Sequence, residues 1–213
     1  DAEGRARFGG HGPAMAQAYN HIILPLADAR DKRTQIVWGA ADFRRRFGRD
    51  TEGMWLPETA ADTPTLEALA DAGVRFTVLA PRQASRVRAS EAEPWADTGN
   101  AEVDTTRPYW VRLPSGRRMS VYFYDGAVSQ AVAFEGLLTR GEHLAGRLAG
   151  ALPPEAGDGA LAHIATDGET YGHHHRFGEM ALAWALDHLE RSETARLTNY
   201  AEHLALHPPT WEA

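Results

Sequence analysis

The sequence has no cysteine, a single lysine at Lys32, and no apolar run near the roughly 20 residues that a membrane-spanning helix needs. The lack of cysteine excludes disulfides, thiolate nucleophiles and thiolate metal sites, and it is compatible with a cytoplasmic protein. Positive charge is also in deficit, because the formal net charge is −7. Binding to nucleic acid requires a concentrated basic surface. We therefore expect a cytoplasmic protein whose partners include neither nucleic acid nor a membrane.

The residues that are present give the composition of a globular domain. Hydrophobic residues make up 43% of the 213 positions and charged residues 24%, which supplies a core and excludes wholesale disorder. A chain of this length fits one domain, and neither an internal repeat nor a low-complexity linker divides it. We predict a single domain over residues 1–213.

Apolar periodicity predicts helices that alternate with short buried strands. The expected helices span Asp31–Phe47, Thr63–Gly73, most of Val128–Leu148, and Phe177–Leu189. The expected strands are Gly53–Leu56, Val74–Leu79, Leu161–Ala165, and a hairpin of Tyr109–Leu113 with Arg118–Tyr124. Residues 85–106 have the composition of a surface excursion. Buried strands between helices indicate an α/β fold with a mainly parallel sheet, either open or closed into a barrel.

Acidic residues stand at or just after the ends of several expected strands. Glu58, Asp125 and Asp167 each occupy such a position. Because the carboxyl ends of parallel strands meet on one face, these acids are candidates for general acid and nucleophile. The alternative is that each acid caps the following helix, which is the role we predict for Asp62. Glutamate is a poor cap, so Glu58 favours a chemical role, whereas Asp167 fits either role.

The densest polar stretch is Asp167-Gly168-Glu169-Thr170-Tyr171-Gly172-His173-His174-His175. Its two glycines let the backbone approach a ligand closely. Its acids, tyrosine and histidines can hydrogen-bond to hydroxyl groups or bind a metal, and the residues alone leave both possibilities open. A second polar stretch, His11–His21, precedes the apolar segment Ile22–Leu26.

Three stretches together resemble glycoside hydrolase family 57, and in particular its long bacterial members. Tyr19–Leu26 is similar to the family's Tyr-x-His-x-Ile-Leu-Pro-Leu segment, and Trp55-Leu56-Pro57-Glu58 is similar to its Trp-Leu-Pro-Glu motif. The stretch Asp167–His173 is similar to Asp-x-Glu-x-Phe-Gly-His, and Phe123–Gly126 falls where the family often has Phe-Arg-Asp. The resemblance extends over most of the chain, from His11 to Pro209.

The resemblance implies a (β/α)7 barrel, which is a distorted relative of the eight-fold version, and retaining chemistry on α-glucans without cofactor or metal. The family's motif roles make Glu58 the nucleophile and Asp167 the acid/base, and such a pair needs its carboxyl groups roughly 5–5.5 Å apart. The reaction is either hydrolysis, as in an amylase, or transfer, as in a 4-α-glucanotransferase or branching enzyme. The candidates for binding an oligo- or polysaccharide substrate are His21, Trp55, Asp125, Glu169 and His173.

Two alternatives stay open. The first is a metal-dependent carbohydrate enzyme, such as a polysaccharide deacetylase or an α-mannosidase, in which Asp167 binds zinc together with His173, His174 or His175. The Trp-Leu-Pro-Glu motif and the Asp-x-Glu spacing favour the metal-free scheme. The second is a sugar-binding barrel without turnover, which is less favoured because both expected catalytic acids are present.

The start of the chain raises a further expectation. The first residue is Asp1, and the residues before Tyr19 show no buried-strand pattern. In the family that the chain resembles, the first barrel strand lies upstream of the Tyr-x-His segment and contributes a histidine motif to the sugar site. We therefore expect an N-terminally incomplete catalytic domain, which forms an open, partial barrel and has little turnover by itself.

Overall fold

The computed structural model describes residues 1–99, 103–154, 157, 159–193 and 195–213, which form two compact units. Unit 1 consists of Asp1–Val103, Pro108–Phe123 and Asn199–Ala213, and unit 2 consists of Asp104–Arg107 and Tyr124–Thr198. Residues 100–102 of the expected surface excursion lie outside the described residues. The single domain expected over residues 1–213 stays a prediction.

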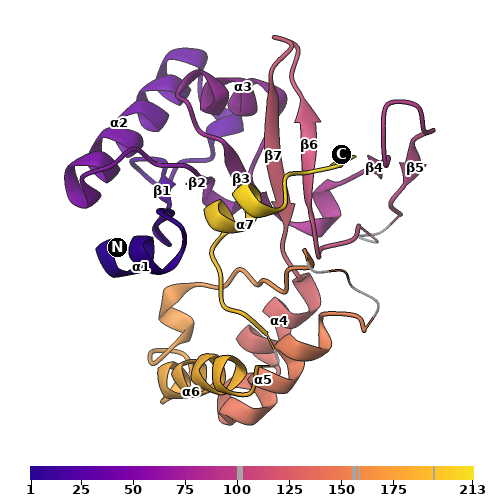
Figure 1. The fold of residues 1–213 in the computed structure, drawn as a ribbon. Coiled ribbons are helices and arrows are strands. Elements are labelled where there is room, and N and C mark those ends of the chain that lie inside the picture. Colours follow the sequence, from indigo (N-terminus) through magenta and orange to yellow (C-terminus); the bar gives the residue numbers. More distant parts are fainter. Residues whose placement is uncertain (100–102, 155–156, 158, 194) are drawn as a thin grey trace. The chain divides into compact units, whose positions relative to one another are not determined.

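The strands of unit 1 form short sheets with mixed pairing (Figure 1). β1 (Ala16–Gln17) pairs in parallel with β2 (Met54–Trp55). A four-stranded sheet has the order β3-β7-β6-β8, with bounds Phe76–Leu79, Arg118–Phe123, Pro108–Arg112 and Trp211–Glu212. A parallel bridge between Gly53 and Phe76 joins the two sheets. The described part of the surface excursion contains the antiparallel pair β4 (Arg86–Val87) and β5 (Ala96–Asp97).

The predicted strand positions and hairpin are confirmed in unit 1. β3 runs parallel to β7, β6 runs parallel to β8, and β6 and β7 are antiparallel partners. The turn between β6 and β7 is closed by a hydrogen bond from the Leu113 N–H to the Arg117 carbonyl, at 2.9 Å. Gly116 has a φ of 83°, a conformation that residues with a side chain adopt at a cost. The Pro-Ser-Gly-Arg signal therefore forms the turn that the sequence indicates.

Helix α2 (Ala29–Phe47) covers β1 through a close backbone contact. Ile36 and Phe43 belong to the predicted apolar pattern and are buried, as is Gly39, whereas Val37 and Phe47 of the same pattern are exposed. A Cβ added at Gly39 would lie 2.0 Å from the carbonyl oxygen of Gln17, so only glycine allows this approach. The left-handed Gly48, with a φ of 66°, ends the helix. The predicted helix is therefore confirmed, with its start two residues earlier than expected.

Helix α3 (Thr63–Asp71) begins at the predicted cap. Oδ1 of Asp62 accepts a hydrogen bond from the Thr65 N–H at 2.8 Å, and the Lys32 ammonium lies 3.1 Å from the same oxygen. Burial by itself would raise the pKa of Asp62, but the hydrogen bonds from Thr65 and Lys32 outweigh it and lower the pKa. The chain's single lysine is thus buried in an ion pair that joins α2 to the start of α3.

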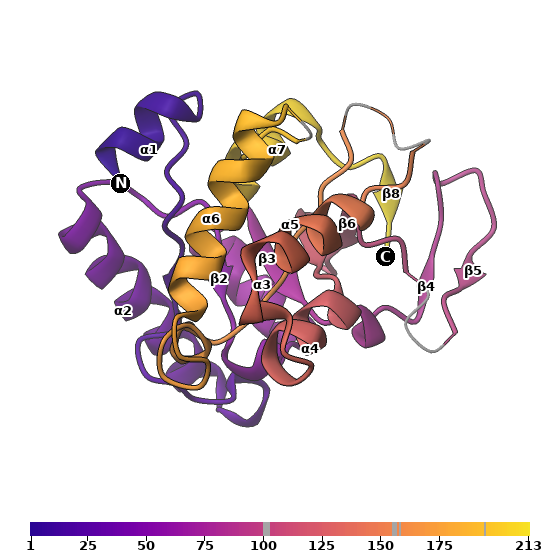
Figure 2. The same cartoon turned by 90° about the horizontal axis from the view of Figure 1, so that it is seen from below.

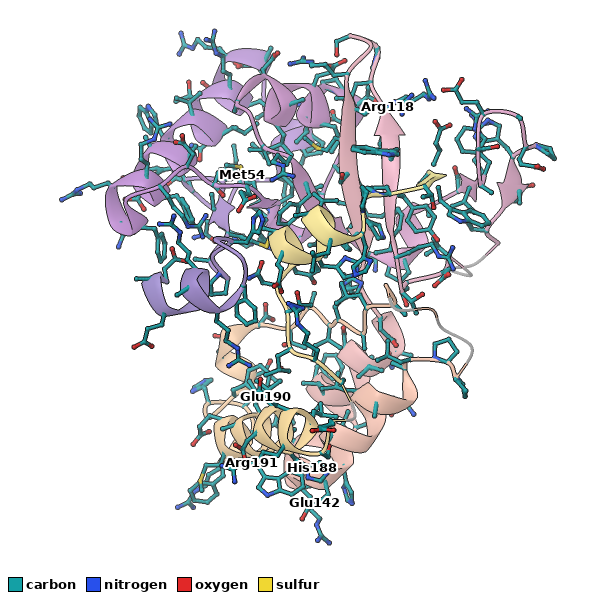
Figure 3. The ribbon with its side chains drawn as sticks, viewed as in Figure 1. Met54, Arg118, Glu142, His188, Glu190 and Arg191 are labelled. Atoms are coloured by element: carbon teal, nitrogen blue, oxygen red, sulfur yellow. The ribbon has the colours of Figure 1, made fainter. Side chains whose placement is uncertain are left out.

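The core of unit 1 lies between these helices and the strands. Leu24, Ile36, Met54, Leu56 and Leu69 are all completely shielded from solvent. Met54, labelled in Figure 3, belongs to β2, so the strand that leads to Glu58 is anchored in the core. Two short helices, α1 (Ala2–Arg7) and α7 (Tyr200–Leu206), complete the unit.

Among its described residues, unit 2 contains the α-helices α4 (Gly126–Phe134), α5 (Gly141–Gly150) and α6 (Gly178–Arg191) (Figure 2). Its core contains Val132, Leu144, Ala185 and Leu189, which come from all three helices. Glu142, His188, Glu190 and Arg191 lie on the exposed faces of α5 and α6 (Figure 3). The helical prediction for residues 128–148 and 177–189 is confirmed, with a break at the left-handed Gly136.

The prediction of a buried strand at Leu161–Ala165 was wrong. This segment is extended chain without a β-ladder, and His163 is its one buried residue. Its backbone makes isolated hydrogen bonds, from Leu161 N–H to the Thr106 carbonyl and from Asp125 N–H to the His163 carbonyl. Asp125 caps α4, where the backbone turns into the helix, and Pro108, two residues after Thr106, has no N–H to donate, so neither neighbour continues the pairing as a ladder.

Candidate active site

Glu58 stands on a single helical turn, Pro57–Thr59, directly after β2. Leu56, Pro57 and Thr59 are buried, whereas the Glu58 side chain is 72% exposed. Both Glu58 and Thr59 adopt left-handed backbone conformations, with φ values of 55° and 54°. This region is unfavourable for residues with a Cβ, and most of all for a β-branched residue such as threonine. Strain of this kind persists only where the surroundings hold it, and it clusters at functional sites.

His21 contacts the Glu58 carboxylate. Its Nε2 lies 3.1 Å from Oε1 of Glu58, and both side chains are mostly exposed. The two residues are far apart in sequence but follow β1 and β2, which are parallel neighbours, so their side chains emerge at the same edge. The structure therefore brings together two of the residues that the sequence motifs single out. Trp55 lies half-buried on β2, three residues before Glu58.

Asp167 stands in unit 2, at the start of a single helical turn formed by Gly168–Thr170. The Asp167 side chain is exposed and makes no capping hydrogen bond to this turn. The capping role that the sequence left open for Asp167 is therefore absent from the structure. Glu169 and His174 are also exposed, and Oε1 of Glu169 lies 3.2 Å from Nε2 of His174.

The loop that carries Asp167 is held by its own buried contacts. The Thr166 and Tyr171 hydroxyl groups are 2.9 Å apart, and Thr170 is buried. Nε2 of His175 donates a hydrogen bond to the Ala133 carbonyl on α4 at 2.9 Å, so this nitrogen carries a proton and does not face outward as a ligand. His173, which was also predicted to bind substrate, is exposed. The loop is thus anchored by the buried Thr170 and by the hydrogen bond of His175, and it exposes the polar side chains of Asp167 and His173.

Asp125 has a structural role in addition to its predicted contact with sugar. Its Oδ1 accepts a hydrogen bond from the Val128 N–H at 2.9 Å and caps α4. The Ser129 hydroxyl donates to the Asp125 carbonyl at 2.6 Å and accepts from the Ala165 N–H at 3.1 Å. Asp125 therefore ties the extended segment before Asp167 to the start of α4.

Sequence reasoning did not single out Thr59 or Gln83. Thr59 shares the left-handed conformation of Glu58, and Nε2 of Gln83 donates a hydrogen bond to the Thr59 carbonyl at 2.8 Å. Neither glutamate nor threonine is favoured at positive φ, so no residue preference in the sequence signals this turn. For Gln83 the one signal is Pro81, which can begin a turn after a strand.

Two further properties concern only the residues that the structure describes. Among them, no group of three or more histidine, aspartate or glutamate side chains is arranged so that it could hold a metal ion. None of their helices has the length and apolar character needed to cross a membrane.

Solved structures define the class of fold. The chain is similar to the 4-α-glucanotransferase of Thermococcus litoralis, with a TM-score of 0.73 and 19% identity over 94% of this chain and 29% of that one. It is also similar to a branching enzyme of Thermococcus kodakaraensis, with a TM-score of 0.70 and 18% identity over 96% and 48% of the two chains. A Mycobacterium smegmatis protein assigned as a polysaccharide deacetylase has a TM-score of 0.63 at 13% identity, over 96% and 67% of the chains.

These similarities show that the chain shares the α/β fold of (β/α)7-barrel enzymes and spans less than half of the first two proteins. Residues 12–212 match the model of glycosyl hydrolase family 57, so the chain belongs to that family. The predicted family and fold class are therefore confirmed. No curated protein matches the sequence.

Proposed function

We propose that this chain belongs to a retaining enzyme of α-glucans, in which Glu58 is the nucleophile and Asp167 the acid/base. The observation that carries the proposal is the exposed, left-handed Glu58, whose carboxylate contacts His21 and whose neighbours are buried. The similar enzymes named above, a 4-α-glucanotransferase and a branching enzyme, support α-glucan as the substrate class. The membership in glycosyl hydrolase family 57 supports cleavage of a glycosidic bond.

The proposed reaction has two displacements. Glu58 attacks the anomeric carbon and forms a glycosyl ester, while Asp167 donates its proton to the departing glycosidic oxygen. Asp167 then removes a proton from the acceptor hydroxyl, whose oxygen displaces Glu58 and restores the original configuration. Water as the acceptor gives hydrolysis, and a sugar hydroxyl gives transfer. This scheme requires a carboxyl separation of roughly 5–5.5 Å, which stays a prediction.

The remaining site residues would orient the sugar and the nucleophile. The His21 imidazole, 3.1 Å from Glu58, holds one carboxylate oxygen and leaves the other free for attack. Trp55 offers an apolar face to a sugar ring, and Glu169 and His173 offer exposed polar groups to its hydroxyls. For Asp125 we retain a weaker binding role, because one of its oxygens already caps α4.

Product analysis on maltooligosaccharides, carried out with a complete and active form of the protein, tests the proposal. Proton NMR of the first products should show the α-anomer, which a double displacement retains and an inverting reaction would not give. Longer oligosaccharides would indicate transfer, whereas glucose and maltose would indicate hydrolysis. The Glu58→Gln variant should lose both kinds of product, and first products with the β-configuration would contradict the proposal.

The metal-dependent alternative retains one supporting observation, the similarity in fold to the assigned polysaccharide deacetylase. It would require Asp167 and nearby histidines to bind a metal, but His175 Nε2 is already bonded to the Ala133 carbonyl. Dialysis against a chelator separates the two schemes. We expect activity on α-glucan to persist, and a loss that zinc reverses would favour the metal-dependent enzyme.

The location and the partners belong to the same proposal. A cytoplasmic location is proposed because the cysteine-free composition is compatible with a reducing compartment. The expected partner is an oligo- or polysaccharide, and cell fractionation with an antibody against the chain tests the location.

A further inference from the structure

We infer that Gln83 is a positioning residue for the nucleophile, because its side-chain amide ties the strained Glu58 turn to the end of β3. Nε2 of Gln83 donates to the Thr59 carbonyl at 2.8 Å, and Oε1 of the same amide accepts from the Ala80 N–H, also at 2.8 Å. All of these residues belong to unit 1. The inference rests on the proposed role of Glu58 as the nucleophile.

The Glu58 turn needs an external anchor. Glu58 and Thr59 are consecutive left-handed residues, and each would relax to a negative φ if the chain were free. Two backbone bonds close the turn, from Thr59 N–H to the Leu56 carbonyl at 2.9 Å and from Ala60 N–H to the Pro57 carbonyl at 3.0 Å. Both bonds are internal to the turn. Rotation about φ of Glu58 would swing its carboxylate away from His21, and rotation about φ of Thr59 would release the chain that follows the turn.

Gln83 supplies such an anchor from a fixed base. It ends a single helical turn, Pro81–Gln83, that directly follows β3 and Ala80. Ala80 is completely buried, and β3 is held in the core by Phe76 and Val78. The amide of Gln83 therefore joins a rigid strand end to the Thr59 carbonyl. This carbonyl belongs to the residue that follows Glu58, so holding it restricts the backbone that aims the carboxylate.

The chemistry of the amide explains why the residue is glutamine. One end must accept a hydrogen bond from the Ala80 N–H while the other donates a hydrogen bond to the Thr59 carbonyl, and an amide does both. A carboxylate of the same length keeps the Ala80 bond but places a second acceptor against the Thr59 oxygen. Gln83→Glu therefore removes the anchor on the Glu58 turn and retains the contact with β3. Gln83→Met, of similar length, removes both bonds.

The test combines hydrogen exchange with covalent trapping, both carried out on a complete and active form of the protein. Amide exchange of Thr59 and Ala60 reports on the turn and needs no activity. A 5-fluoroglycosyl fluoride of the α-gluco configuration reports on Glu58: the carboxylate bonds to C1, fluoride leaves, and the fluorine at C5 slows loss of the ester. The labelling rate is measured at about pH 7, where a glutamate introduced at position 83 is ionised. The rate is normalised to the fraction of molecules that become labelled, so unfolded protein does not contribute to it.

In Gln83→Glu we expect both amides to exchange at least about 10-fold faster than in the wild type. Labelling of Glu58 should slow by about 10- to 100-fold, because small displacements of a reacting group are costly. Gln83→Met should behave similarly. Arg82→Gln, at the exposed neighbour in the same turn, is the matched control and should leave both rates unchanged.

Each other outcome overturns a defined part of the account. Unchanged exchange of Thr59 and Ala60, or equal labelling of Glu58, in Gln83→Glu refutes the positioning role. An effect in Gln83→Met that Gln83→Glu lacks assigns the role to the Ala80 bond and also refutes the inference. If the wild type is labelled on another residue, the proposed function of Glu58 fails, and the exchange data still show whether Gln83 holds the turn.

Discussion

Replacing Glu58 by glycine and by alanine separates backbone strain from loss of the side chain. Both variants remove the carboxylate and its contact with His21, so their difference reports the cost of a Cβ at a φ of 55°. A residue with a Cβ lowers the stability of the folded state by about 1–2 kcal/mol in the left-handed conformation. Glycine in place of alanine lowers the stability by about 0.4–1 kcal/mol, because it gives the unfolded chain greater conformational freedom. Glu58→Gly should therefore be more stable than Glu58→Ala by about 0.5–1 kcal/mol.

Urea unfolding measures this difference directly, and a thermal scan should show Glu58→Gly melting about 1–4 °C higher. The matched pair is Asp71→Gly and Asp71→Ala at the last residue of α3, where both variants lose the ion pair with Arg117. In a right-handed helix the order should reverse, with glycine less stable by about 0.5–1 kcal/mol. If alanine is the more stable residue at both positions, the strain attributed to the Glu58 turn is refuted.

Three further outcomes follow from the packing and the chemistry. Asp62→Ala should cost about 2–4 kcal/mol in urea unfolding, because it removes a cap and leaves the buried Lys32 unpaired. The lowered pKa of Asp62 gives a contribution to stability that is complete above its ordinary value of 3.8 and is lost as the pH falls through the lower folded value, so Asp62→Asn should flatten this acid limb. Gly39→Ala should cost about 2–3 kcal/mol, because the new methyl group meets the Gln17 carbonyl, and an unchanged unfolding midpoint would contradict the close approach of α2 to β1. Asp167→Asn should slow cleavage of substrates with poor leaving groups by about 10²–10⁴-fold and spare glycosyl fluorides, whereas equal losses on both would contradict its role as the acid.

Local signals in the sequence were sufficient for most elements of the fold. The periodic apolar residues of α2, the Asp62 cap of α3 and the Pro-Ser-Gly-Arg hairpin turn each depend on neighbouring residues, and all three are present. The strand prediction for Leu161–Ala165 failed because the apolar character of a segment does not indicate which other segment pairs with it. A strand requires a second chain segment with consecutive free backbone groups, and the sequence does not reveal which segments lie alongside.

The candidate site was predictable in its residues more than in its geometry. The motifs single out His21 and Glu58, and the parallel pairing of β1 and β2 explains why they meet. The left-handed conformation of Glu58 and Thr59 was not predictable, because residue preferences oppose it and tertiary contacts such as the Gln83 amide maintain it. The capping role of Asp125 depends on where α4 begins, which the expected start at Val128 placed two residues too late.

The residue that becomes covalently attached to the sugar is the most direct test of the proposed mechanism. A complete and active form of the protein would be incubated with the 5-fluoroglycosyl fluoride, digested, and sequenced by tandem mass spectrometry, with Glu58→Gln and Glu142→Gln treated in parallel. We predict one added glycosyl group, located on Glu58, which is lost in Glu58→Gln and retained in Glu142→Gln, because Glu142 is an exposed glutamate on α5 outside the proposed site. Attachment to a different residue, or labelling that survives Glu58→Gln, would contradict the assignment of Glu58 as the nucleophile.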